Sequence, residues 1–302
     1  MSTHHHHTHP AAHTHDAAGH SHGPADFNRA FALGIVLNTT FVAVEAFYGW
    51  QVNSLALLAD AGHNLSDVAG LVLAWVDALA LRLQPNARHT YGFRRASILA
   101  AFANAVLLLV AMGSLAWEAL QRLGTPEATQ GWTIMAVAAV GIVVNTATAL
   151  LFLRGRAHDL NVRGAFLHMA ADALVSLGVV IGGALYLWQG WRWLDPVLSL
   201  VIVVVIVAGS WGLLRQSLHL LFDGVPSHID LPDLHDWLAA RPGVARVNDL
   251  HVWGISTTQV ALTAHLLMPQ APADDDFLRD TSAALQAQFG IDQSNPLDAR
   301  LP

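Results

Sequence analysis

The sequence lacks cysteine and lysine, and it contains few charged residues of either sign. Because none of the 302 residues is cysteine, disulfide bridges, thiolate nucleophiles and thiolate metal ligands are excluded. Any metal ion must therefore be bound through nitrogen and oxygen atoms. Only 12% of the residues are charged and 54% are hydrophobic, whereas a soluble domain has about 25% charged residues. This composition excludes a disordered chain, a coiled coil and a disulfide-stabilised secreted scaffold.

The few charges leave long apolar runs between them. Four runs contain no Asp, Glu, Lys or Arg, namely 96–117, 128–153, 173–191 and 196–214. Each is close to the ~20 residues that an α-helix needs to cross the core of a bilayer. Two further apolar stretches near the N-terminus are interrupted by carboxylates. We therefore expect an α-helical membrane protein with six transmembrane helices at roughly 30–50, 54–81, 96–120, 132–153, 164–188 and 195–221.

The placement of arginine predicts the orientation of this bundle. If alternate loops lie on the same side of the membrane, nine arginines fall on the side of both termini, and Arg122 and Arg192 fall on the other. Cytoplasmic loops carry an excess of positive residues. Both termini are therefore expected in the cytoplasm. The absence of lysine and the compact loops favour a bacterial inner membrane.

Polar segments flank the predicted bundle at both ends. Residues 4–22 contain nine His, a composition typical of metal-binding low-complexity segments, and a purification tag is the alternative. Residues 223–302 carry eleven Asp and four Arg, a balance that suits cations and does not suit nucleic acid. We expect a flexible tail over 1–26, a transmembrane domain over 27–222 and a cytoplasmic domain over 223–302.

The acidic segment is expected to form a small domain of its own. Its pattern predicts a helix over 231–240, strands over 245–253 and 259–268, a helix that starts in the acidic cluster 274–276, and a short strand near 291–295. This α-β-β-α-β order indicates a two-layer α+β domain.

Two identical pairs of ionisable residues interrupt the predicted spans. His63 and Asp67 are four residues apart, as are His168 and Asp172, so each pair shares one face of its helix. Such residues are costly inside a membrane and indicate function. At 1.5 Å per residue, both pairs lie near the middle of a ~30 Å core, where transporters bind substrate. Two imidazoles and two carboxylates complete a tetrahedral set for a zinc-like cation. The alternative is that these residues tie helices together.

This chemistry predicts an exchange of metal for protons. Zinc binds deprotonated His and Asp, so protons and metal displace one another, and His titrates near neutral pH. A site of this kind that moves between the two sides of a membrane is an antiporter. Asp60 could be a fifth ligand or a proton relay, although we favour a packing or capping role. Glu45, Asn38, Asn104 and Asn145 are expected to hydrogen-bond between helices or to line a water path.

Three segments resemble the cation diffusion facilitator family. They are SLALLADAGHNLSD at 54–67, NVRGAFLHMAAD at 161–172 and DLHVW at 249–253. The resemblance covers residues 27–292. It implies a homodimeric exchanger with six helices per protomer and a cytoplasmic ferredoxin-like domain, which exports Zn²⁺ in exchange for protons. It also implies that His63, Asp67, His168 and Asp172 are the transport ligands.

The resemblance implies further sites in and near the cytoplasmic domain. His251 and His265 would bind a regulatory zinc ion at the dimer interface. The family often adds a His in the last strand, where this chain has Gln293, a poor zinc ligand. The regulatory site is therefore either incomplete or completed by Asp275 and its neighbours.

Two other family features fall near the junction of membrane and cytoplasm. Arg95 and Asp223 match a pair that forms a charge interlock, and two solvated surface charges are the alternative. The loop 82–95 holds a second metal site in part of the family. Only His89 matches that site here, since Asn86 and Phe93 replace the other ligands, so we expect no metal in this loop.

Three alternatives to a zinc exporter stay open. The first is the export of another divalent cation such as Cd²⁺, Co²⁺ or Fe²⁺, because affinity order alone does not decide the metal. The second is an intramembrane metalloenzyme, which needs an open coordination position and a general base. The chain contains no H-E-x-x-H motif, so we do not expect an enzyme. The third is a membrane metal sensor that transports nothing.

Overall fold

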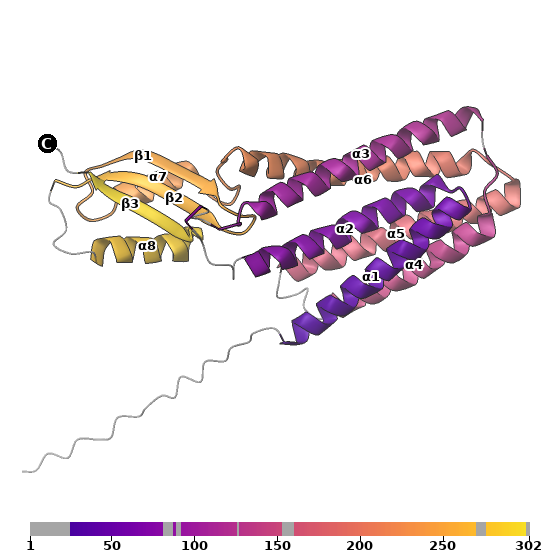
Figure 1. Ribbon diagram of the computed structural model, residues 1–302, viewed down its shortest axis with the longest axis horizontal. Coiled ribbons are helices and arrows are strands. Elements are labelled where there is room, and N and C mark those ends of the chain that lie inside the picture. The colour runs from indigo at the N-terminus through magenta and orange to yellow at the C-terminus, as the bar shows by residue number, and fades with distance from the viewer. Residues whose placement is uncertain are drawn as a thin grey trace, which may run out of the picture.

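The structure, a computed structural model, describes residues 25–80, 87–88, 92–125, 127–152, 160–269 and 276–299. Six long helices in this part of the chain precede a small domain of helices and strands (Figure 1). The helices are α1 (Ala25–Gln51), α2 (Leu55–Ala80), α3 (Ala96–Gly124), α4 (Gly131–Phe152), α5 (Leu160–Gln189) and α6 (Leu194–Leu221). The His tract, Asn86, His89 and Asp275 lie outside the described residues.

The helices form a bundle that is apolar both inside and outside. Helix α1 packs along α2, α3 along α6, and α4 along α5. Small and medium apolar side chains fill the interior, among them Leu57, Met112 and Val179. Large apolar side chains such as Val143 and Val204 point outward and are about two-thirds exposed, at 67% and 66%. A surface of this kind suits lipid rather than water.

Four of the described helices are long and apolar enough to cross a membrane, over Ala96–Gly124, Gly131–Leu150, Phe166–Gln189 and Leu194–Leu221. They belong to α3, α4, α5 and α6, and they indicate a membrane protein. Among the described residues, α1 and α2 are not apolar enough over a sufficient length to be counted with them. Both carry buried carboxylates, Glu45 in α1 and Asp60 in α2.

Exposed tryptophans gather at one end of the bundle. Trp50, Trp132, Trp188, Trp191 and Trp193 lie at or near the turns that join α1 to α2, α3 to α4 and α5 to α6, and each is exposed. Tryptophan is enriched where a membrane meets water. We call this end of the bundle the distal end. The C-terminal domain lies at the opposite end, which we call the domain end (Figure 1).

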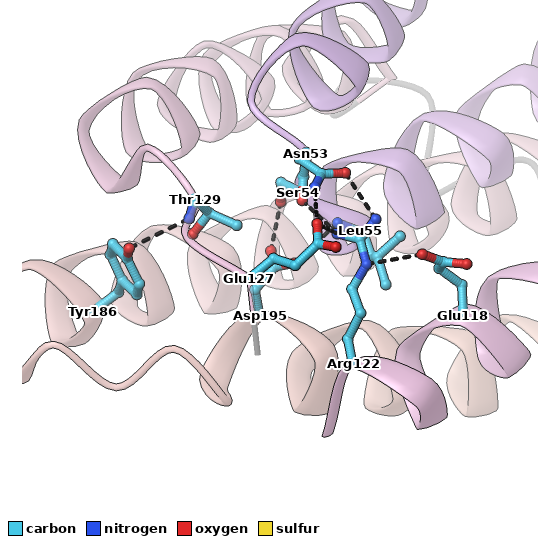
Figure 2. A network of polar contacts seen from close by, with 9 residues as sticks. All are labelled: Asn53, Ser54, Leu55, Glu118, Arg122, Glu127, Thr129, Tyr186 and Asp195. Atoms are coloured by element: carbon cyan, nitrogen blue, oxygen red, sulfur yellow. Dashed lines mark hydrogen bonds and ion pairs between the residues drawn. The ribbon is translucent and has the colours of Figure 1, made fainter. Parts of the chain in front are cut away.

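A network of polar contacts closes the distal end (Figure 2). Asn53 takes a left-handed conformation (φ 57°) in the turn between α1 and α2, which Asn tolerates better than most residues. Arg122 of α3 donates to the backbone oxygen and to Oδ1 of Asn53, at 2.8 and 2.7 Å. Asp195 of α6 accepts from Ser54 Oγ at 2.5 Å and from the backbone N–H of Leu55 at 2.9 Å. The start of α2 is thus tied to both α3 and α6.

The C-terminal domain has the α-β-β-α-β order that the sequence predicts. Its elements are α7 (Leu231–Ala239), β1 (Arg246–Gly254), β2 (Val260–Leu267), α8 (Asp276–Phe289) and β3 (Gln293–Ala299). Strand β2 lies in the middle of the sheet, antiparallel to β1 and parallel to β3. The last strand extends beyond the predicted 291–295.

One face of this sheet is covered and the other is open. Leu262, Ala264 and Leu266 alternate along β2 and are buried in one core with Leu234 of α7 and Leu285 of α8. The residues between them, at 263, 265 and 267, are only partly buried. Because successive side chains of a strand point to opposite faces, His265 lies on the face that the helices leave uncovered.

The distal network makes a testable prediction. Asp195→Ala removes the acceptor for two buried donors, and an unsatisfied buried donor costs about 1–3 kcal/mol. We expect this variant to lower the apparent unfolding temperature of the purified protein in detergent. Asp195→Asn keeps one acceptor oxygen and should lose less. An Asp195→Ala protein as heat-stable as the wild type would show that the network does not stabilise the bundle.

Candidate metal centre

The structure brings together four ionisable side chains from α2 and α5. His63 and Asp67 lie on one face of α2, and His168 and Asp172 lie on one face of α5. One ligand atom from each residue lies within 4.8 Å of the other three. The described residues contain no other group of three or more His or carboxylate side chains that is arranged in this way. We call these four residues the metal centre.

The shortest contacts of the metal centre run between the two helices. His168 Nε2 lies 3.0 Å from Asp67 Oδ2, and His63 Nε2 lies 3.4 Å from Asp172 Oδ1. Within one helix, the distances from His to Asp are longer, at 3.6 and 3.7 Å. Each imidazole therefore faces the carboxylate of the other helix, so the centre is a junction of α2 with α5.

The donor set fits a zinc-like cation. Asp172 Oδ2 is buried and receives no hydrogen bond from the described residues. Buried polar atoms without a partner are rare in proteins, and a bound cation would provide one here. Two imidazole nitrogens and two carboxylate oxygens match the four-coordinate preference of zinc, whereas Mg²⁺ and Ca²⁺ prefer oxygen ligands alone. The four protein ligands leave no open position of the kind that a catalytic metal needs.

The four residues of the metal centre differ in exposure along the axis of the bundle. Helix α2 runs toward the domain end and α5 runs away from it, so Asp67 and His168 lie nearer that end than their partners do. Their side chains are 28% and 42% exposed. On the distal side, His63 and Asp172 are only 18% and 3% exposed. Exposure thus decreases from the domain end toward the distal end.

The chain matches two families of domains that together cover most of its length. Residues 31–222 match the cation efflux transmembrane domain, and residues 226–294 match the cytoplasmic domain of cation efflux proteins. This chain belongs to the cation efflux family, also called the cation diffusion facilitators.

Several bacterial relatives are similar over most of their length. The zinc transporter ZitB of Escherichia coli is 37% identical over 275 residues, which are 89% of this chain and 86% of the relative. The cadmium, cobalt and zinc/H(+)-K(+) antiporter of Bacillus subtilis is 31% identical over 83% of this chain and 81% of its own. The metal cation efflux system protein CzcD of Cupriavidus metallidurans is 34% identical over 83% of this chain and 79% of its own.

In this cation efflux protein, the two histidines of the C-terminal sheet lie near one another. His251 of β1 pairs with Thr263 of β2, two residues before His265 on the same face. Diagonal neighbours of this kind lie about 7–8 Å apart. His265 Nδ1 lies 3.3 Å from Asp249 Oδ2. Within the described residues, these side chains do not make a group of three possible ligands as the metal centre does.

Sequence reasoning did not single out Asp249 as a possible partner of His265. Asp249 has a positive φ of 45° and lies where the pairing of β1 with β2 shifts register. A register shift of this kind redirects a side chain, and its position is not visible in the residue pattern. Gln293, at the position of the expected third His, begins β3 and pairs with Ala261.

Contacts between the bundle and the C-terminal domain include the expected charge pair. The Arg95 guanidinium, just before α3, donates a hydrogen bond to Asp223, just after α6. Both side chains are more than half exposed, so the contact by itself contributes about 0–1 kcal/mol. Nearby, the backbone N–H of Thr257 donates to Ser97 Oγ at 3.2 Å. The two contacts connect the start of α3 to one residue that precedes β1 and to one that follows it.

Polar residues around the metal centre connect α2 to its other neighbours. Asn104 of α3 donates to the backbone oxygen and the hydroxyl of Ser66, at 3.2 and 3.0 Å, and Ser66 precedes Asp67. Sequence reasoning identified Asn104 as an inter-helix hydrogen-bonding residue, and this is confirmed. It did not identify Ser66, because a Ser in an apolar helix is common and gives no signal of its own.

We expect each of the four residues of the metal centre to contribute to metal binding. Asp172→Asn and His168→Ala each remove one ligand, so we expect the zinc affinity of the purified protein to fall by more than the ~10–100-fold typical of outer-shell changes. Isothermal titration calorimetry in detergent measures this loss. The matched control is Asp236→Asn, since Asp236 is an exposed carboxylate of α7. Unchanged affinity in both ligand variants would rule out the centre.

Proposed function

We propose that this protein exports Zn²⁺ from the cytoplasm in exchange for protons. The observation that carries the proposal is the metal centre: two imidazoles and two carboxylates from two helices, in the interior of an apolar bundle. A closed metal site at that depth has no evident structural purpose, whereas a transporter binds its substrate there. The names of the relatives, which are transporters of zinc, cadmium and cobalt, support the same proposal.

Metal and protons compete for the same atoms of the centre. Zinc binds a neutral imidazole and an ionised carboxylate, so metal binding releases protons and protonation releases metal. The distances from His to Asp of 3.0 to 3.7 Å mean that the protonated imidazoles would pair with the carboxylates when metal is absent. The centre is therefore either metal-bound or protonated, and each of these two states excludes the other.

The exposure of the centre supports access from the cytoplasm in the conformation described here. Asp67 and His168, the two residues nearer the domain end, are partly exposed, while the network of Asn53, Arg122 and Asp195 ties the helices together at the distal end. In the proposed cycle, metal enters from the domain end and binds the four ligands. Movement of α2 and α5 relative to α3 and α6 then opens the distal end, where protons replace the metal.

In this proposal, all six long helices cross a bacterial inner membrane, and both termini lie in the cytoplasm. Helices α1 and α2 owe their lower hydropathy to residues inside the bundle, such as Glu45 and Asp60, which are almost completely buried. The arginine count favours a cytoplasmic domain end. The exposed tryptophans of the distal end would lie at the opposite membrane surface.

We also propose that the protein is a homodimer whose cytoplasmic domain binds regulatory zinc. The match to a domain described as the cytoplasmic domain of cation efflux proteins supports this proposal. The open face of the sheet carries His251 and His265. A second copy against this face could complete a site that one chain leaves short of ligands. Metal there would favour the closed arrangement of the two protomers.

Transport in sealed vesicles tests the main proposal. The wild-type protein in proteoliposomes with an acidic interior should take up zinc while the interior pH rises, because each metal ion is exchanged for protons. Asp172→Ala should abolish both signals, and Asp236→Asn should leave both unchanged. Zn²⁺, Cd²⁺, Co²⁺, Fe²⁺ and Mn²⁺ are compared side by side. Tight zinc binding without flux would identify a sensor or a structural site, and the transport proposal would be wrong.

A second measurement tests the regulatory site. Zinc that binds the cytoplasmic domain should change the rate of transport at a fixed concentration of transported metal. We expect the double variant His251→Ala with His265→Ala to lose this dependence and to keep zinc binding at the metal centre. His228→Ala, a change of a histidine outside the sheet, serves as the control. If the double variant keeps the metal dependence of the wild type, the regulatory site lies elsewhere.

A further inference from the structure

Two acidic side chains of the bundle are buried more deeply than the metal centre itself. Glu45 of α1 is 0% exposed and Asp60 of α2 is 1% exposed. Neither belongs to the metal centre, and neither forms an ion pair with an arginine or histidine of the described residues. A buried carboxylate without a counter-charge is costly, so the two groups need another means of stabilisation.

The hydrogen bonds of Glu45 and Asp60 leave one oxygen of each without a donor. Asn64 donates to Glu45 Oε2, and Ser176 of α5 donates to Asp60 Oδ2, each at 3.2 Å. Glu45 Oε1 and Asp60 Oδ1 are buried and receive no hydrogen bond from the described residues. Asn64 lies four residues after Asp60 on the same face of α2, so its contact with Glu45 places Glu45 against the face of α2 that carries Asp60. Because ionised carboxylates have no proton to donate, a hydrogen bond between the two groups would require a proton on one of them.

Electrostatics points to the same protonation state. Two negative charges side by side in a medium of low dielectric constant repel strongly, and carboxyl pairs in such places hold one proton in common. Asp60 interacts electrostatically with Glu45, Asp172 and His63. Glu45 interacts in this way with Asp60. Two such carboxyl groups on facing helices favour one shared proton.

The pair lies one helical turn beyond the metal centre on the distal side. Asp60 precedes His63 by three residues in α2, which starts at the distal end. Ser176 follows Asp172 by four residues in α5, which ends there. The network of Figure 2, at the start of α2, lies farther out again. A proton that enters from the distal side would reach Glu45 and Asp60 before it reached the metal ligands.

We propose that Glu45 and Asp60 share one proton and relay protons between the distal side and the metal centre. The proposal rests on the metal–proton exchange proposed above. A proton from the distal side binds the free carboxylate oxygen of the pair, and a proton leaves the pair for His63 or Asp172. The pair returns to one proton and one negative charge. No covalent bond between heavy atoms changes and no electrons are transferred.

Two transport rates measured on the same full-length protein in proteoliposomes test this relay. The first is net zinc uptake against protons, which needs proton transfer at every turnover. The second is the exchange of radioactive zinc for unlabelled zinc at equal concentration and equal pH, which needs none. Glu45→Gln and Asp60→Asn keep the size and hydrogen bonding of a neutral acid but release no proton. We expect net uptake to fall at least about tenfold and exchange to stay within about twofold of the wild type.

Control variants separate proton transfer from packing. The swap Glu45→Asp with Asp60→Glu keeps two carboxyl groups and should recover net uptake. Asp195→Asn, a carboxylate-to-amide change at the distal end, should alter net uptake and exchange by the same factor. Infrared difference spectra provide a readout apart from transport. The wild type should show the carbonyl band of a neutral carboxylic acid at neutral pH, and the double variant Glu45→Gln with Asp60→Asn should lack it.

Several outcomes would overturn the relay. Net uptake and exchange could fall together in Glu45→Gln and Asp60→Asn, which would give the pair a structural role or place it on the metal path. Net uptake could also persist in both variants, or the wild type could lack the acid band. The failure of the proposed function is a different result, since the wild type itself would then move no protons against zinc.

Discussion

The contacts between imidazole and carboxylate groups across α2 and α5 are the constraint on which the rest of the bundle depends. Ionisable groups are costly inside a membrane unless they are paired, hydrated or bound to an ion. His63 faces Asp172 and His168 faces Asp67, so each helix provides a carboxylate for the imidazole of the other. These two contacts favour one arrangement of α2 against α5. It also explains why the apolar pattern is broken where it is, at one turn of each helix.

The other helices support this junction in different ways. Asn104 ties α3 to the turn of α2 that carries Asp67, and α6 holds the start of α2 through Asp195. Helix α1 contributes Glu45, which is completely buried. Around α2 the polar contacts thus form successive layers along the bundle, from the open centre through the carboxyl pair to the closed distal end. A layered arrangement of this kind fits the alternating access proposed above, in which one side opens while the other stays shut.

Much of the fold and of the site could be predicted from the sequence because both depend on local periodicity. Charge-free runs mark α3 to α6, and the i, i+4 spacing places each His beside its Asp on one helix face. The partnership of Glu45 with Asp60 could not be predicted, since it depends on which face of α1 meets α2. The contact of Ser54 with Asp195 joins residues 141 positions apart, and no pattern in either segment indicates the other. Asp249 was missed because a backbone irregularity sets its direction.

All four residues of the metal centre come from a single chain. In the proposed homodimer, each protomer would therefore carry its own metal centre, and the second protomer would add a parallel pathway rather than half of a shared one. An inactive protomer would lower the activity of the dimer but would leave the metal centre of the other protomer intact. In a population that carries both intact and defective copies, the loss would be proportional to dose.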